Sequence, residues 1–476
     1  MIAKLKGGGH RRLPLQMKNN SFEMDMCRGS IIGKVISFSI PLMLTGVLQL
    51  FYNAADIIVV GQFSGKEALA AVGSTGSLIN LLINVFLGLS VGTSVTVAQR
   101  YGAGDWENVH ATVHTSVALA LVCGFGVGLL GFVIAKPLLI LMGSPADVID
   151  ASTLYIRIYF IGMPANMLYT FGSAILRAVG DTKRPLIFLT IAGLINVTLN
   201  LLFVIIFHMS VAGVALATIL SQAASAVLVM RSLTRATGQV RVVPKDIRFH
   251  RESLQKIARI GLPAGLQGTL FSISNVLIQS SINSFGSVVM AGNAASSNLE
   301  GFVYTSMNSI YQACLTFVGQ NIGAKQYARV RKTLWVCLGT VTVVGLVLGS
   351  LFTLFAGPLL SIYNSDPQVI SQGIVRLSII ASTYFLCGVM ETLVGQLRGL
   401  GYSLVPMIAT LASVCVLRIV WVYTAFVQYP AVETLMWSYP ISWSLAVLFH
   451  SVTYYIVQRK LPRDNQPLPE GYSCAR

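Results

Sequence analysis

Residues 111–134 read ATVHTSVALALVCGFGVGLLGFVI, and this stretch contains no Lys, Arg, Asp or Glu. A helix needs about 20 apolar residues to cross the hydrocarbon layer of a bilayer, so the stretch predicts a transmembrane helix. The rest of the chain is similarly apolar: of the 476 residues, 54% are apolar and only 11% are charged. An ordinary soluble domain has about 25% charged residues. The composition therefore excludes a soluble enzyme, a disordered chain and a nucleic-acid-binding protein.

The apolar runs along the chain predict an all-α polytopic membrane protein with twelve transmembrane helices. Each run is long enough for one crossing of the bilayer. The predicted spans lie near residues 36–60, 68–97, 111–134, 150–174, 186–207, 211–230, 260–283, 290–318, 333–355, 368–394, 403–427 and 437–457.

The placement of the basic residues explains the net charge of +16. If the N-terminus lies inside, 28 of the 33 Lys and Arg residues fall in inner segments, three fall within spans, and only Lys66 and Lys136 fall in outer loops. This asymmetry follows the positive-inside rule. We expect a cell-membrane protein with both termini in the cytoplasm, and we expect its basic segments to meet anionic lipid.

A shift of about 221 residues superimposes the two halves of the chain. The matches include Gln99 with Gln320, Arg177 with Arg398, Pro185 with Pro406 and, at a shift of 222, Pro41 with Pro263. An even number of spans in each half puts both halves into the membrane in the same direction, so the repeat is parallel. Two such lobes around one cavity are typical of alternating-access transporters, although duplicated membrane proteins also include channels and scaffolds.

The repeat and the charge pattern together divide the chain into five parts. We expect the first tail to be disordered, because it is polar and basic and contains a run of three glycines. Several early methionines leave the start of translation open. The parts are an N-terminal cytoplasmic tail (1–35), a first lobe (36–230), a cytoplasmic linker (231–259), a second lobe (260–457) and a C-terminal cytoplasmic tail (458–476).

Four polar residues of the first lobe share nearly one depth in the predicted membrane. Asp56 and Asn200 each lie about seven residues from the outer end of their helices, or about 10 Å deep. Thr218 lies at the matching depth, and Asn196 lies one turn from Asn200 on the same face. One carboxylate with neutral oxygens suits a proton or a small cation. The alternative is that the neutral residues only bond neighbouring helices.

The second lobe does not repeat this set, since Asp56 aligns with Ile278. It carries Glu300 near the predicted midplane and Arg418 deep in a later span. We expect both to face the substrate cavity, and a Glu300–Arg418 pair is a hypothesis that leaves open a cavity charge or a structural ion pair. Arg376 is expected near an outer helix end, where its long side chain would reach the interface.

Helix 1 carries further candidates on either side of the membrane midplane. Pro41 permits a bend that would change the surroundings of Asp56, although a proline at a helix start is an equally good interpretation. Gln49, Tyr52 and Asn53 share much of the Asp56 face, so they either line the substrate cavity or bond a neighbouring helix.

The sequence predicts no bound metal and no cofactor other than a coupling ion. Seven cysteines form no C-x-x-C pair, and they indicate neither a disulfide framework nor a zinc site. His110 and His114 have the spacing of two ligands on one helix face, but further ligands are missing from the pattern. No P-loop motif is present, so an ATP-driven pump would need another subunit.

Several motifs resemble those of MATE transporters. They are Ile40-Pro41, Tyr52-Asn53-Ala54-Ala55-Asp56-Ile57-Ile58-Val59-Val60-Gly61, Ala98-Gln99-Arg100-Tyr101-Gly102-Ala103-Gly104, Leu176-Arg177-Ala178-Val179-Gly180-Asp181-Thr182 with Pro185, and residues 213–221. The resemblance covers residues 36–458. It implies proton- or sodium-driven efflux of drugs and other amphipathic, often cationic, compounds through a V-shaped fold of two lobes.

The resemblance also implies roles for single residues. Asp56 matches the family's cation-binding aspartate and Pro41 its bending proline, while Gln49 matches a position that faces the cavity. Asn196 and Thr218 match neutral members of the first-lobe site. At Asn200 the chain departs from one branch of the family, which has a second aspartate at this position. Another branch of the family has a glutamate in the region of residues 270–274, and this chain has none there.

We therefore expect a monomeric antiporter that exports amphipathic, cationic small molecules in exchange for H⁺ or Na⁺. The main alternative is a flippase for a lipid-linked precursor in the same fold, which would favour a strongly basic cavity. An intramembrane transferase would need clustered carboxylates or a cavity histidine, and the sequence has neither. A receptor or scaffold without transport activity is the remaining class.

Overall fold

A computed structural model describes residues 23–141, 145 and 148–462, and within these residues the chain is helical and has no β-strand. The first lobe contains α1 (Ile31–Phe63), α2 (Gly65–Ala103), α3 (Trp106–Leu141), α4 (Ile149–Ile161), α5 (Met163–Ala178), α6 (Lys183–Leu201) with a π-helical turn (Leu202–Ile206), and α7 (Ser210–Thr234). The second lobe contains α8 (Arg251–Asn283), α9 (Ser287–Gly323), α10 (Tyr327–Leu354), α11 (Ala356–Ser361), α12 (Pro367–Thr383), α13 (Phe385–Gly399), α14 (Leu404–Thr410) with a π-helical turn (Leu411–Val416), α15 (Leu417–Tyr423), α16 (Ala425–Gln428) and α17 (Val432–Arg459).

The twelve predicted spans all correspond to helical segments. Within the described residues, eight segments are long and apolar enough to cross a membrane, and the pair α12–α13, bent by 43°, makes a ninth. The other three are α4–α5, which is interrupted at Gly162, and the more polar helices α8 and α9. Both α8 and α9 pack against α2 of the other lobe, so parts of their surfaces meet protein instead of lipid.

Several helices begin or end well beyond the predicted spans. The helix α8 begins at Arg251 although its span was predicted from residue 260, and α2 continues to Ala103 although its span was predicted to end at residue 97. Apolar runs measure the depth of the hydrocarbon layer, whereas helical hydrogen bonds continue into water. The linker is correspondingly shorter than predicted, and it runs through two 3₁₀ turns, Gly238–Val240 and Pro244–Asp246.

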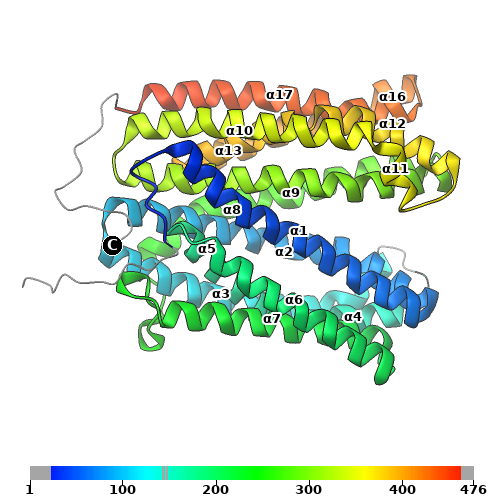
Figure 1. Ribbon diagram of the computed structural model, residues 1–476, viewed down its shortest axis with the longest axis horizontal. Helices are drawn as coiled ribbons and strands as arrows, with labels where there is room; N and C mark the ends of the chain where they lie inside the picture. Colours follow the sequence, from blue (N-terminus) through cyan, green and yellow to red (C-terminus); the bar gives the residue numbers. More distant parts are fainter. Residues whose placement is uncertain (1–22, 142–144, 146–147, 463–476) are drawn as a thin grey trace, which may run out of the picture.

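The two lobes lie side by side with their helices roughly parallel, and α1 crosses diagonally between them (Figure 1). Near its start, the ring of Phe38 meets Phe317 of α9 edge-on, with ring centroids 5.8 Å apart. Further along, Tyr52 lies against Gly193 of α6. The helix therefore contacts the second lobe as far as Phe51, whose ring centroid lies 5.9 Å from that of Phe302, and its last turns pack within the first lobe.

Glycines of α2 and α8 bring the two lobes into backbone contact. A Cβ atom on Gly88 would lie 2.1 Å from the backbone nitrogen of Gly265, and one on Gly92 would lie 2.2 Å from the carbonyl oxygen of Ile257. No larger residue fits at either position without separating the helices. This contact involves the last half of α2 and the first half of α8.

A reciprocal pair of hydrogen bonds, one from α2 to α13 and one from α9 to α5, closes the same end of the molecule. Gln99 donates to the carbonyl of Gly399 at 2.8 Å, and its repeat partner Gln320 donates to the carbonyl of Ala178 at 2.7 Å. Ala178 and Gly399 are themselves repeat partners. The two lobes are thus related at this interface by an approximate two-fold axis.

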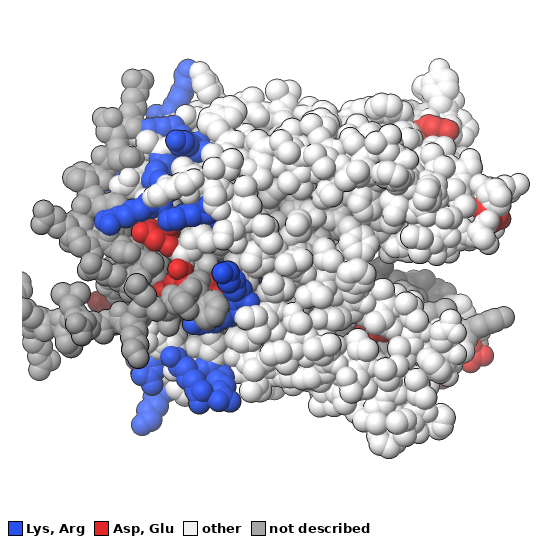
Figure 2. Space-filling model, viewed as in Figure 1, with Lys and Arg blue, Asp and Glu red and all other residues white. Residues whose placement is uncertain are grey.

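The glycines one turn further along repeat the same reciprocity. A Cβ atom on Gly102 would lie 2.0 Å from the carbonyl oxygen of Gln320, and one on Gly323 would lie 1.9 Å from that of Gln99. Lys and Arg gather at this end of the face drawn in Figure 2, and we call it the basic end. The space-filling surface is notched between the lobes at the opposite end (Figure 2).

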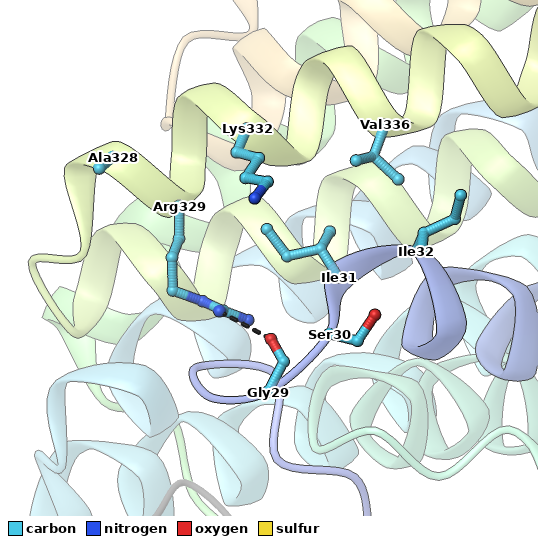
Figure 3. A pocket seen from close by; sticks show the side chains of 8 residues that line it. All are labelled: Gly29, Ser30, Ile31, Ile32, Ala328, Arg329, Lys332 and Val336. Atoms are coloured by element: carbon cyan, nitrogen blue, oxygen red, sulfur yellow. Dashed lines mark hydrogen bonds between the residues drawn. The ribbon is translucent and has the colours of Figure 1, made fainter.

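The segment before α1 is ordered between the lobes, which corrects part of the prediction that residues 1–35 form a disordered tail. Met26 is fully buried, and Arg329 of α10 donates to the carbonyls of Met26 and Gly29 at 3.0 Å each (Figure 3). The helix α1 then begins at Ile31. The packing could not be predicted from the polar composition of the segment, because hydrogen bonds to its backbone carbonyls help to hold it. Residues 1–22 lie outside the described part of the chain.

Candidate functional site

The structure brings the four predicted polar residues of the first lobe together. The amide nitrogen of Asn200 donates to Oδ1 of Asp56 and, at 3.2 Å, to Oδ1 of Asn196. The amide of Asn196 donates to Oγ1 of Thr218 at 3.5 Å. Asn196 and Thr218 also interact with the Asp56 carboxylate directly. Asp56 is half-buried, whereas Asn200 is fully buried.

Local features of α6 place these side chains against α1. Gly193 leaves room for the ring of Tyr52, whose hydroxyl donates to the carbonyl of Thr190 at 3.5 Å. Tyr52 and Asp56 lie one turn apart on α1, and Gly193 and Asn196 lie nearly one turn apart on α6. The facing surfaces of the two helices therefore stay in register. Tyr52 therefore bonds a neighbouring helix, which is one of the two roles predicted for it.

The chemistry of this cluster suits a small cation or a proton. It contains one carboxylate and the neutral oxygens of two amides and a hydroxyl, which are hard ligands. Oδ1 of Asn200 is buried and accepts no hydrogen bond within the described part of the chain. An uncompensated buried acceptor is costly, so an ion or a proton beside it would supply the missing partner.

Pro41 lies well inside α1, which begins ten residues before it. The alternative of a proline at a helix start is thereby excluded. Pro41 has no amide proton to give to the carbonyl of Ser37, which weakens the helix in the part that packs against the second lobe. Gln49 and Asn53, in contrast, are exposed on α1 although they lie at membrane depth, and polar residues so placed suit the wall of an open cavity.

In the second lobe, Glu300 pairs with Arg376, so the predicted Glu300–Arg418 pair is wrong. Arg376 donates to both carboxylate oxygens, with Nε 2.8 Å and Nη2 2.7 Å from them. Its third nitrogen, Nη1, donates to Asn293 at 2.6 Å. Arg376 is 6% exposed, and the expectation that it reaches outward to the membrane surface is also wrong.

Arg418 lies beside this pair and has different partners. Its Nε donates to the hydroxyl of Ser442 at 3.1 Å and its Nη1 to Oδ1 of Asn275 at 3.2 Å. Its guanidinium lies over the ring of Tyr439, 4.1 Å from the centroid. Arg418 is fully buried, and its Nη2 has no hydrogen-bond partner within the described residues.

Glu300, Arg376 and Arg418 all line one cavity of about 230 Å³. Aromatic side chains make up much of the remaining wall. They are Phe271, Tyr304, Tyr384, Tyr439 and Trp443. The cavity therefore combines three charged groups with flat apolar surfaces.

Two charged residues of the second lobe were not among the predicted site residues. Arg376 was assigned to the membrane surface from its position in the apolar run. Glu391 of α13 is partly buried. An ionisable residue within a span is a functional candidate by default, and this rule, applied to Glu391, would have found it.

The histidine pair on α3 has a structural role in this conformation. Nε2 of His114 accepts a hydrogen bond from the backbone nitrogen of Val243 at 2.9 Å. Nδ1 of His114 donates to the carbonyl of His110 at 2.8 Å. Asp246 lies near His110, so three residues of types that bind metals come together here. Both nitrogens of His114 are nevertheless occupied by backbone groups, and the histidine fixes the linker to α3.

The fold and these sites define a class of protein. Two duplicated lobes of membrane helices meet at one end and separate toward the other, and each lobe carries charged groups at membrane depth. This is the architecture of an alternating-access membrane transporter. The chain belongs to the MatE family, the MATE transporters, because the family model matches residues 41–202 and again residues 263–424.

Individual relatives are similar over most of the chain. The probable multidrug resistance protein YpnP of Bacillus subtilis is 30% identical over 394 residues, which cover 83% of this chain and 88% of that protein. The FAD transporter of Shewanella oneidensis is 24% identical and covers 90% and 95%. Among solved structures, a MOP superfamily transporter from Pyrococcus furiosus has a TM-score of 0.88 at 23% identity, covering 94% of this chain and all of that one.

Proposed function

We propose that the protein is a secondary active antiporter that exports drugs or other amphipathic, cationic compounds in exchange for H⁺ or Na⁺. Asp56 holds the coupling ion, and Asn196, Asn200 and Thr218 complete its shell. The basic end faces the cytoplasm, with both termini on that side. The protein works as a monomer, because each chain contains both lobes.

The convergence of one carboxylate and three neutral side chains at one depth carries this proposal. A carboxylate at membrane depth is expensive to maintain without a function. The Asp56 cluster joins α1 to α6 and α7, and α1 also touches the second lobe. Occupancy of the cluster is therefore linked to the helix that connects the lobes. The multidrug resistance proteins among the relatives support the assignment of drugs as cargo.

Coupling requires that the ion bind one conformation more tightly than the other. A ligand shifts a two-state equilibrium only by the ratio of its two affinities. The described conformation is closed at the basic end through α2, α8 and α9. Export then needs a second conformation in which these contacts separate and the opposite end closes.

The test is uptake of a cationic dye into everted membrane vesicles, driven separately by a proton gradient and by a sodium gradient. We expect one gradient to drive uptake by the wild type, and we expect Asp56→Asn to fold but to lose uptake. Gln62→Ala, which changes an exposed residue near the end of the same helix, is the matched control and keeps most of the activity. Normal coupling by Asp56→Asn would contradict the proposed ion site.

A flippase for a lipid-linked precursor is the second candidate, and the unpaired Arg418 favours it because such lipids carry phosphates. The relative named an FAD transporter supports a cargo range that includes phosphate compounds. Absence of dye uptake under both gradients, together with flipping of a fluorescent lipid-linked phosphate in proteoliposomes, would move the assignment to this candidate.

A further inference from the structure

The charges around the second-lobe cavity do not cancel. Glu300 neutralises Arg376, and every nitrogen of Arg376 is bonded. Glu391, another acidic side chain of this lobe, does not line the cavity. Arg418 is therefore the remaining positive charge among the described residues that line the cavity.

A buried, unpaired guanidinium is unfavourable unless an anion joins it. The two partners of Arg418 are neutral oxygens, which bond it without cancelling its charge. Its Nη2 carries two unused protons, and a second proton of Nη1 is also available. A carboxylate or a phosphate accepts two parallel hydrogen bonds from such a fork.

The surrounding wall indicates what kind of compound carries the anion. The indole nitrogen of Trp443 is a second buried donor without a partner among the described residues. Tyr439 lies between Arg376 and Arg418, at 5.6 Å and 4.1 Å from their guanidinium carbons. Aromatic faces next to a cationic fork suit an acid group on a flat, apolar body.

The position of the cavity in the repeat supports the same interpretation. Tyr439 is the repeat partner of Thr218, and Arg418 directly follows Leu417, the partner of Asn196. The second lobe thus has an unpaired cation next to the position that corresponds to Asn196 of the first-lobe cluster.

The geometry points to an anion-binding subsite at Arg418, which takes the carboxylate or phosphate group of an amphipathic, aromatic cargo. This inference rests on the proposed function and narrows it, because cargo then carries an acidic group in place of, or in addition to, a cationic one. Arg418 binds the acid group, Asn275 and Ser442 orient the guanidinium, and Tyr439 and Trp443 pack against the aromatic body.

The test compares equilibrium binding of 2-naphthoate and of the neutral 2-naphthamide to purified full-length protein in detergent. We expect naphthoate to bind at least about tenfold more tightly than naphthamide, as one charge-assisted pair predicts. Asn275→Asp places a carboxylate beside Nη1 of Arg418, and Arg418→Met removes the charge. Both should weaken naphthoate by about tenfold or more and leave naphthamide unchanged.

Ser280→Asp is the matched control, because it adds the same charge to an exposed position of α8 that does not line the cavity. It should leave both affinities unchanged. Asn275 is exposed, so Asn275→Asp tests the proposal even if Arg418→Met does not fold. Equal binding of the two probes, or naphthoate binding that Asn275→Asp does not alter, would overturn the subsite.

Competition with chloride and inorganic phosphate distinguishes a cargo group from a free anion. We expect naphthoate to displace both salts at concentrations well below theirs. Displacement of naphthoate by chloride at equal concentration would assign the site to an inorganic anion and overturn the cargo assignment. Binding needs no gradient and should survive Asp56→Asn, so a failure of ion-coupled transport is separate from a failure of this proposal.

Discussion

At the scale of single residues, the first-lobe site depends on what stands beside Asp56. Asn200 gives that carboxylate a neutral donor, where a second carboxylate would repel it. Depth along the helices, counted at about 1.5 Å per residue, was sufficient to predict that Asp56, Asn196, Asn200 and Thr218 converge. Depth does not say toward which neighbour a side chain points, and for this reason Glu300 was paired with Arg418 when its actual partner is Arg376.

Asn200→Asp should make the first-lobe site depend on a bound cation. Two carboxylates in contact cannot both be ionised without a cation or a shared proton. At pH 8 we expect NaCl to raise the melting temperature of this variant more than that of the wild type, relative to choline chloride. Gln62→Asp, which adds a carboxylate to an exposed position near the end of α1, is the control. An equal sodium effect in all three proteins would contradict the prediction.

Asp181, between α5 and α6, should make stability depend on pH. Burial raises the pKa of Asp181 to about 6, against the opposing effect of Arg184. The folded state therefore holds the proton more tightly than the unfolded chain does. The contribution of this group to the free energy of unfolding falls as the pH rises from about 4 to about 6, by up to about 3 kcal/mol, and stays low above that range.

Asp181→Asn should remove this part of the pH dependence, since the amide oxygen still accepts from the backbone nitrogen of Arg184. The measurement is the melting temperature in detergent between pH 4.5 and 7.5. Glu107→Gln, at an exposed position of the basic end, serves as the control and should follow the wild type. Identical slopes for Asp181→Asn and the wild type would rule out this role for Asp181.

At the scale of elements, the segment before α1 shows where sequence patterns stop being informative. Apolar periodicity predicts helices that bury side chains, but residues 23–30 are held largely through carbonyl groups that Arg329 and Asn321 bond. Bent helices are a second limit, because depth counted along a straight helix fails where α12 and α13 meet at 43°. Arg376 lies on α12 before this bend, and its prediction failed because position along the apolar run does not show that the side chain turns inward to Glu300.

Arg329→Ala should loosen the segment before α1. The substitution removes the donors to the carbonyls of Met26, Arg28 and Gly29, and one hydrogen bond to a charged group contributes about 1.5–3 kcal/mol. We expect trypsin to cut after the exposed Arg28 about tenfold faster. Lys332→Ala, a change in the same pocket (Figure 3), is the control. Unchanged cleavage of Arg329→Ala would show that other contacts hold the segment.

At the scale of the whole molecule, the conformation is set by glycine contacts at the basic end. Gly102 and Gly323 each meet a carbonyl of the other lobe, and these atoms cannot move aside as a flexible side chain would. Gly323→Ala should therefore disfavour the conformation that is closed at the basic end. Gly126→Ala is the control, because nothing lies within 4 Å of a Cβ atom there.

Labelling of Asn53→Cys by a membrane-impermeant maleimide measures this shift, in a background without the seven native cysteines. Asn53 is exposed while the basic end is closed. We expect Gly323→Ala to slow labelling from the side opposite the basic end by several-fold, and Gly102→Ala to do the same because its contact is equivalent. Normal labelling in both variants would mean that the contacts do not control the conformation.

The reciprocal bonds of Gln99 and Gln320 also record the history of the molecule. In a symmetric homodimer, residue i of one chain contacts residue j of the other, and residue j contacts residue i. The bonds from Gln99 to Gly399 and from Gln320 to Ala178 have this form within one chain. They imply an ancestral six-helix protein that closed on a second copy of itself, with the same site in both copies. Once the linker fused the copies, one could keep an aspartate at membrane depth while the other gained an arginine.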